Sequence, residues 1–109
     1  MVIQLDRRRT PRYPFGGVAE VTAPRSGKYL IALTRELGRF GCFVRTMTPI
    51  PAGEEVSLTI THHDREFTVS GEVAYVLPTE GMGIAFGAIP LSDQAVLEKW
   101  LADSESDAA

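Results

Sequence analysis

The chain has 109 residues, of which 44% are hydrophobic, and its formal net charge at pH 7 is −3. This length and this apolar content are typical of one globular domain with its own core. The acidic balance argues against a general nucleic-acid binder, because such a protein needs a broad basic surface to displace counterions from many phosphates. The sequence has neither an apolar run long enough to span a bilayer nor a signal core behind its N-terminal charges, which predicts a cytoplasmic location.

Cys42 is the only cysteine of the chain, so an internal disulfide is excluded and a reducing compartment is consistent with the sequence. It lies between Gly41 and Phe43 in a strand-like segment. We expect a small packing residue at this position, not a nucleophile.

Four arginines lie within residues 7–12, whose sequence is RRRTPR. Guanidinium groups are fixed forks of donors that match phosphate oxygens and stack on flat rings, so the cluster indicates a site for a small anion or a nucleotide. Pro11 disfavours helical geometry at Thr10, and we therefore expect an extended arm from which Arg8 and Arg12 project. The alternative interpretation is a solvated, disordered basic tail.

Six short segments have the pattern of β-strands and are separated by turns rich in glycine and proline. The second segment carries an apolar run between two glycines; a helix is the alternative there, but the run lacks clean helical spacing and we expect a strand. The six expected strands cover residues 18–23, 28–37, 42–46, 54–61, 66–75 and 82–86.

Alternation of apolar and polar residues is clearest in the fourth and fifth expected strands. Val56, Leu58 and Ile60 alternate with polar residues, which is the period of a strand with one buried face. The fifth strand is expected to bury a face made of Phe67, Val69, Gly71, Val73 and Tyr75.

A helix is expected after the strands, with Ser92 as its N-cap, Asp93 in its first turn and an end near Ala102. Its apolar stripe is expected to cover the open end of a barrel, and a partner-binding face is the alternative. The stripe consists of Val96, Leu97, Trp100 and Leu101.

The predicted fold class is therefore mainly β: a six-stranded antiparallel β-barrel, closed so that no strand edge is left open, with a C-terminal α-helix. We expect a flexible arginine-rich arm at residues 1–17, the barrel and helix at residues 18–102, and an acidic tail at residues 103–109.

No pattern of a catalytic or metal site stands out. His62, His63 and Asp64 suggest a metal, but adjacent strand residues point to opposite faces and no further ligands cluster nearby, so we expect a solvated turn. Glu54 and Glu55 are interpreted as surface charges and not as an acid/base pair. No nucleophile triad or Walker-type loop is present, and neither enzyme activity, a metal nor a cofactor is expected.

Two motifs give the chain a resemblance to a known family. Residues 8–12 (RRTPR) form an RxxxR arrangement, and residues 36–41 (ELGRFG) align with the motif Asp/Asn-x-Ser-x-x-Gly. Residues 81–86 (GMGIAF) and a capped helix with Leu97 and Trp100 follow in the same order. In these features the chain resembles the PilZ domain family, receptors for the bacterial second messenger cyclic di-GMP.

The resemblance implies a set of ligand-binding residues. Arg8 and Arg12 would bind the phosphates and guanines of cyclic di-GMP, and Arg7 and Arg9 would add positive charge nearby. Arg39 would compensate for hydrogen bonds that the second motif lacks. The second motif would contribute through Glu36, Gly38 and Gly41.

Two positions of the second motif depart from the family pattern. Glu36 stands where Asp or Asn is expected, and Gly38 replaces the serine. Glutamate keeps an acceptor but places it farther out, and glycine removes a hydroxyl. The loss of one or two hydrogen bonds of about 1 kcal/mol each would weaken binding roughly tenfold to a hundredfold.

Three hypotheses follow for the function. The first is a non-catalytic cyclic di-GMP receptor whose arm becomes ordered on the ligand and so presents a new surface to a downstream protein partner. The second is a degenerate PilZ-like adaptor that binds a protein partner without nucleotide. The third, a barrel that binds nucleic acid through its arginine arm, fits the net charge least well.

Overall fold

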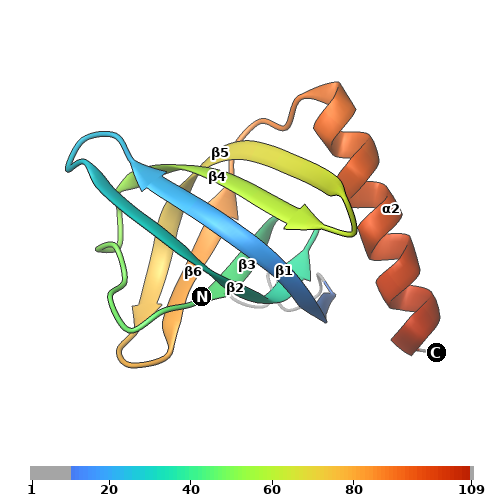
Figure 1. Cartoon of the computed structure of the whole chain (residues 1–109), viewed down its shortest axis with the longest axis horizontal. Coiled ribbons are helices and arrows are strands. Elements are labelled where there is room, and N and C mark those ends of the chain that lie inside the picture. Colours follow the sequence, from blue (N-terminus) through green and yellow to red (C-terminus); the bar gives the residue numbers. More distant parts are fainter. Residues whose placement is uncertain (1–10, 109) are drawn as a thin grey trace, which may run out of the picture.

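The computed structural model describes residues 11–108. Six strands and one helix follow one another along this part of the chain (Figure 1). They are β1 (Arg12–Ala23), β2 (Lys28–Gly38), β3 (Gly41–Arg45), β4 (Glu55–His62), β5 (Arg65–Leu77), β6 (Gly81–Phe86) and α2 (Leu91–Ala108).

The strands form a closed barrel in the order β1-β2-β3-β6-β5-β4, and every neighbouring pair is antiparallel. The barrel closes where β1 pairs with β4, with Ala19 opposite Ile60. In a closed barrel fewer backbone donors and acceptors are left unpaired than in an open sheet, whose edge strands can pair with other chains. The predicted fold class, with its C-terminal helix, is confirmed, and the second segment is a strand.

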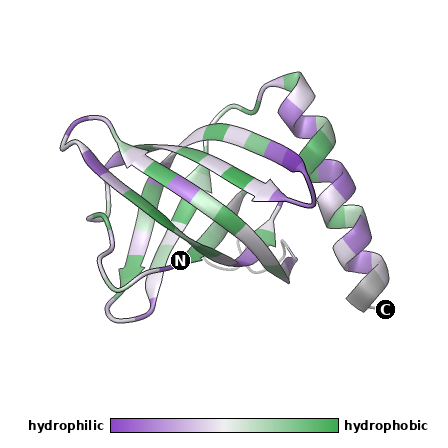
Figure 2. Ribbon diagram, viewed as in Figure 1, coloured by the Kyte–Doolittle hydropathy of each residue, from purple (hydrophilic) through white to green (hydrophobic). Residues whose placement is uncertain are grey.

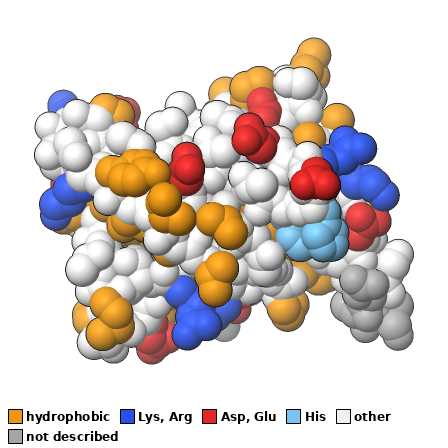
Figure 3. All heavy atoms as spheres, viewed as in Figure 1, with side chains coloured by type: hydrophobic (Ala, Val, Ile, Leu, Met, Phe, Trp, Pro, Cys, Tyr) orange, Lys and Arg blue, Asp and Glu red, His pale blue; other side chains and the backbone are white. Residues whose placement is uncertain are grey.

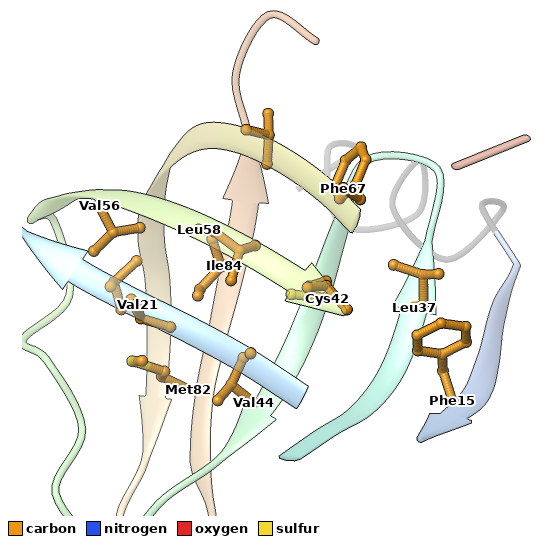
Figure 4. Packing of buried hydrophobic residues seen from close by; sticks show 14 of the residues in the cluster. Phe15, Val21, Leu37, Cys42, Val44, Val56, Leu58, Phe67, Met82 and Ile84 are labelled. Carbon is orange, nitrogen blue, oxygen red and sulfur yellow. The ribbon is translucent and has the colours of Figure 1, made fainter. Parts of the chain in front are cut away.

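The core fills the barrel and continues under the helix. The strands bury one face each: in β1 every second residue from Phe15 to Ala23 is buried. Hydrophobic and hydrophilic residues accordingly alternate along the elements (Figure 2). Buried side chains from β1 to β6 point toward one another inside the barrel (Figure 4). Each fully buried Val, Leu or Phe contributes about 1.5–3 kcal/mol relative to an exposed one.

Helix α2 lies at one end of the barrel, packed against β5 and β1 (Figure 1). Leu97, Trp100 and Leu101 of its apolar stripe belong to the buried core, so the stripe covers the barrel as expected. The carboxylate Oδ1 of Asp93, in the first turn, accepts a hydrogen bond from the backbone N–H of Thr68 at 2.8 Å. This bond ties the start of the helix to β5.

Both ends of α2 differ from the expectation. The helix begins at Leu91, because the N–H of Gln94 donates to the carbonyl of Pro90 at 2.8 Å; Ser92 therefore lies inside the first turn and is not the N-cap. The helix continues past Ala102 to Ala108. Residues 103–108 are mostly Asp and Ser, which have modest helix propensity. The i,i+4 pair between Lys99 Nζ and Asp103 Oδ1, at 3.4 Å, supports the helix at the start of this extension. Residues 103–108 are helix and not a separate tail.

Strand β1 also begins earlier than expected, at Arg12 instead of residue 18. It pairs with β2 up to Arg12 opposite Gly38, and a shift of register between Pro14 and Gly17 interrupts the ladder. A bulge allows a strand to continue past a proline, which has no N–H to donate. Residues 12–17 are thus part of the barrel, and residues 1–10 of the expected arm lie outside the described residues.

The turn between β4 and β5 consists of two residues, His63 and Asp64, with φ of 50° and 64°. Positive φ at both central positions is the geometry of the tight hairpin turns that match strand twist. It also brings the rings of His62 and His63 into a stack, with centroids 4.0 Å apart. The turn is where the sequence predicts it, but the expectation that these two side chains point to opposite faces is wrong, because His63 already belongs to the turn and no longer has strand geometry.

In the described part of the chain, no helix has the length and apolar character needed to cross a membrane.

Thr79, in the turn between β5 and β6, has a φ of 67°. A non-glycine residue in this conformation destabilises the folded state by about 1–2 kcal/mol. Glycine avoids this strain, but its greater freedom in the unfolded chain lowers stability by about 0.5–1 kcal/mol. We expect Thr79→Gly to raise the free energy of unfolding by about 0.5 kcal/mol, measured by urea unfolding. The control is Thr22→Gly, on the exposed side of β1, which should lower this free energy by about 1 kcal/mol. A Thr79→Gly protein less stable than the wild type would contradict the assignment of strain.

Candidate ligand-binding site

The pairing of β1 with β2 brings the two sequence motifs together. Arg12, the last residue of RxxxR, lies directly opposite Gly38 of the second motif. Arg7, Arg8 and Arg9 lie outside the described residues. The structure therefore places one arginine of the cluster, and that arginine lies beside the turn of residues 38–41 between β2 and β3, called the glycine turn below.

A hollow of about 280 Å³ lies beside this pair. Residues of both motifs line it, together with one side of β5 and β6, and they include Arg12, Gly38, Phe40, Gly41, Tyr75 and Gly83. The lining thus combines an arginine, three aromatic residues (Phe40, Tyr75 and Phe86) and backbone that glycines leave without side chains. Such a lining suits a flat ligand that carries negative charge.

Tyr75 and Phe40 are site residues that the sequence did not predict. Tyr75 was expected in the buried face of its strand, but the register of β5 on β6 shifts between Val73 and Tyr75. This bulge turns the ring out of the core and over Gly83, where a Cβ atom would overlap it. Phe40 is 66% exposed at the tip of the glycine turn. The glycines alternating on β6 were the available signal, since they leave room for a ring on the neighbouring strand.

Gly38 allows β1 and the turn to approach closely. A Cβ at this position would lie 3.0 Å from the carbonyl oxygen of Pro11 and 3.3 Å from Cγ of Arg12. A serine, as in the family motif, would need its neighbours to move by a few tenths of an ångström. The glycine that replaces the family's serine at position 38 therefore allows the two motifs to lie close together.

Gly41 has a packing role. A Cβ at this position would lie 2.5 Å from the carbonyl oxygen of Ile84 on β6. Strand β3 can lie this close to β6 only without a side chain here, so the last glycine of the motif is required by the barrel itself.

Glu36 and Arg39 lie apart from this hollow. Glu36 is half-buried on β2, opposite Pro14 and Phe43, and does not line it. The guanidinium of Arg39 pairs with the carboxylate of Glu98 on α2, which also accepts a hydrogen bond from Gln94 Nε2 at 2.9 Å.

These contacts at Glu98 have an electrostatic consequence. The hydrogen bond from Arg39, followed by that from Gln94, lowers the pKa of the Glu98 carboxyl. Both donors stabilise the charged form of the carboxylate. Arg39 is thus held by the helix and directed away from the hollow.

Cys42 lies next to this region on β3 and is buried. Burial raises the pKa of its thiol to about 12, and the nearby charge of Arg12 lowers it only in part. A thiol with such a pKa remains protonated near neutral pH and is a poor nucleophile. The expected packing role is consistent with this environment. The described residues also contain no group of three side chains suited to hold a metal ion.

Gly41→Ala is expected to lower the free energy of unfolding by about 2 kcal/mol, because the added methyl group overpacks the contact between β3 and β6. Gly16→Ala is the control: it adds the same group in β1, where nothing lies within 4 Å, and should change stability by less than about 0.5 kcal/mol. Urea unfolding measures both variants. Equal stability of the two would show that Gly41 is not needed for packing.

Comparison with known proteins gives matches to one family. The PilZ domain model matches residues 6–103. The fold is similar to that of the PilZ domain of YcgR from Escherichia coli with c-di-GMP, with a TM-score of 0.72, 14% identity and coverage of 94% of either chain. No curated protein matches the chain.

Two longer proteins contain a similar domain. Bacillus subtilis inhibitor of motility (MotI/DgrA) has a TM-score of 0.74 and 18% identity, over 93% of this chain and 52% of that one. The MrkH–c-di-GMP complex of K. pneumonia has a TM-score of 0.74 and 21% identity, over 94% of this chain and 54% of that one. The chain thus spans about half the length of these two proteins. With the family match covering most of the sequence and the barrel and helix in place, this chain belongs to the PilZ domain family.

Proposed function

We propose that this domain is a non-catalytic receptor for cyclic di-GMP, which it binds through the RxxxR segment and the glycine turn. One observation carries the proposal: Arg12 lies opposite Gly38, at a hollow that also presents Phe40 and Tyr75. Family membership supports the same ligand, since structures of PilZ domain proteins with c-di-GMP are known. The proposed location is the cytoplasm.

The chemistry of the ligand fits these groups. A cyclic dinucleotide carries two phosphates and two guanines, so it needs cations, forked donors for the guanine acceptor edge and flat surfaces for stacking. Arg12 supplies a cation and a fork of donors, and in this proposal Arg8 supplies the second. Phe40 and Tyr75 supply rings; a base stacked on an aromatic side chain gains about 1–3 kcal/mol.

The rings also bear on the two departures from the family motif. In this proposal the ligand loses hydrogen bonds, because Gly38 has no hydroxyl and the acceptor of Glu36 is displaced. Stacking of the guanines on Tyr75 and Phe40 offsets this loss of binding free energy. The close approach at Gly38 contributes by holding Arg12 next to the turn.

The proposed switch is the ordering of the arm that precedes β1. Arg7, Arg8 and Arg9 carry like charges that repel one another, and a ligand with two phosphates neutralises them. The arm then folds against the glycine turn and changes the surface offered to a downstream protein. Arg39 belongs to the same turn and is available to the ligand only when it leaves Glu98.

Isothermal titration calorimetry with cyclic di-GMP tests the proposal. Arg8→Ala and Arg12→Ala are each expected to weaken binding by about tenfold to a hundredfold, the loss of a charge-assisted hydrogen bond of about 1.5–3 kcal/mol. Arg25→Ala removes the same charge from the turn between β1 and β2 and should leave the affinity unchanged. No heat with the wild type, or equal affinities in all four proteins, would rule out the receptor.

Glu98→Gln tests whether the helix competes with the ligand for Arg39. The substitution keeps the size of the side chain and removes the negative charge, so we expect cyclic di-GMP to bind a few-fold more tightly. Glu55→Gln, on the exposed side of β4, is the control for net charge. Unchanged affinity in Glu98→Gln would show that Arg39 takes no part in binding.

A protein adaptor that ignores nucleotide is the second candidate. The position of Glu36 outside the hollow favours it, because the motif then lacks its acceptor at the site. Capture of a partner that is independent of cyclic di-GMP and unaffected by Arg8→Ala would support the adaptor over the receptor.

A further inference from the structure

A second and larger hollow, of about 630 Å³, lies at the end of the barrel where α2 crosses it. Three elements form it: the start of β1, the hairpin between β4 and β5, and the second half of α2. Its lining includes Phe15, His62, His63, Arg65, Lys99 and Trp100. None of its lining residues belongs to the hollow beside Arg12.

The floor of this hollow is aromatic and rigid. Phe15 and Trp100 are buried core residues with ring centroids 5.1 Å apart. The ring of His62 lies 4.4 Å from that of Phe15 and edge-on to Trp100 at 5.7 Å. Its Nδ1 is 3.1 Å from the carbonyl oxygen of Gly16, which can only accept, so Nδ1 is the donor. The core and this bond together hold the imidazole in place.

His63 continues the aromatic surface outward. Its ring stacks on His62 with an interplanar angle of 22°, and the residue is exposed. One face of the ring is therefore covered by His62 while the other is open to solvent. The barrel core does not need this ring, but a flat ligand can stack on it.

The rim of the hollow carries a surplus of positive charge. The charged residues that line the hollow are two cations, Arg65 and Lys99, and one carboxylate, Asp103. Asp103 pairs with Lys99 at 3.4 Å. Ser104 and Ser106 add hydroxyl groups. Histidine, Lys/Arg and Asp/Glu side chains lie together where the hairpin meets the helix (Figure 3). Because the whole chain has a net charge of −3, this local surplus marks a place suited to an anion.

We propose that this hollow is a second ligand site, which binds a mononucleotide. The imidazole of His63 stacks on the base, and Arg65 and Lys99 bind the phosphate. The size agrees, since sites for small molecules enclose about 300–1,000 Å³. The aromatic floor favours a ligand with a ring over inorganic phosphate alone. This site uses none of the residues of the cyclic di-GMP proposal and stands independently of it.

The test is a titration of the Arg12→Ala protein with GMP, monitored by amide NMR shifts, so that the other hollow is weakened. We expect shifts at residues 62–65 and 99–106 and a Kd below about 1 mM. Arg65→Ala and Lys99→Ala should each weaken binding about tenfold, and His63→Ala should weaken it several-fold. Arg25→Ala, far along the barrel in the turn between β1 and β2, should have no effect.

Two further probes separate the contributions of base and phosphate. Guanosine and inorganic phosphate should each bind at least tenfold more weakly than GMP. Shifts confined to residues 12 and 38–41, or equal affinity of GMP for the Arg12→Ala protein with and without the added Arg65→Ala or Lys99→Ala substitution, would overturn the site. Phosphate binding as tight as GMP would overturn the stacking role of His63. Cyclic di-GMP titrations of Arg65→Ala, which should match the wild type, report on the first hollow alone.

Discussion

The pairing of β1 with β2 is the contact on which the rest of this structure depends. It forms one side of the barrel wall and places Arg12 opposite Gly38, so that two motifs separated by more than twenty residues meet at one end of a ladder. The approach is close because Gly38 has no side chain to hold the strands apart. Gly41, which also lacks a side chain, allows β3 to lie close to β6. Gly38 and Gly41 thus allow close packing of the strands, and both border the hollow beside Arg12.

Helix α2 is the second organising element, and it has a different role on each side. Its buried stripe completes the core, and Asp93 fixes its first turn to β5. On one side Glu98 holds Arg39 of the glycine turn. On the other side Lys99 and Trp100 face the hairpin between β4 and β5. Residues of α2 thus line the second hollow directly, whereas none lines the hollow beside Arg12; there the helix only holds the neighbouring Arg39.

Local sequence patterns predicted most of the fold because their causes are local. Alternation along β4 reflects one buried face, and the apolar stripe of α2 reflects the period of a helix. Bulges break this regularity. The one before Tyr75 turns a ring expected in the core toward the hollow beside Arg12, and the one near Pro14 lets β1 begin at Arg12. Neither bulge shows in the apolar and polar pattern of its own strand, because a bulge is decided by pairing with the neighbouring strand; for Tyr75 the signal lies in the glycines of β6.

By itself, the sequence determined the strand and helix segments, the RxxxR segment and the glycine turn, since each depends on residues that are close together in the chain. Only the tertiary structure decided that Arg12 faces Gly38, that Arg39 is held by Glu98, and that Phe40 and Tyr75 border the same hollow. The histidine stack at the second hollow belongs to this group as well. The physical reason is common to all of them: each contact joins elements whose distance and register are set by closure of the barrel and docking of α2.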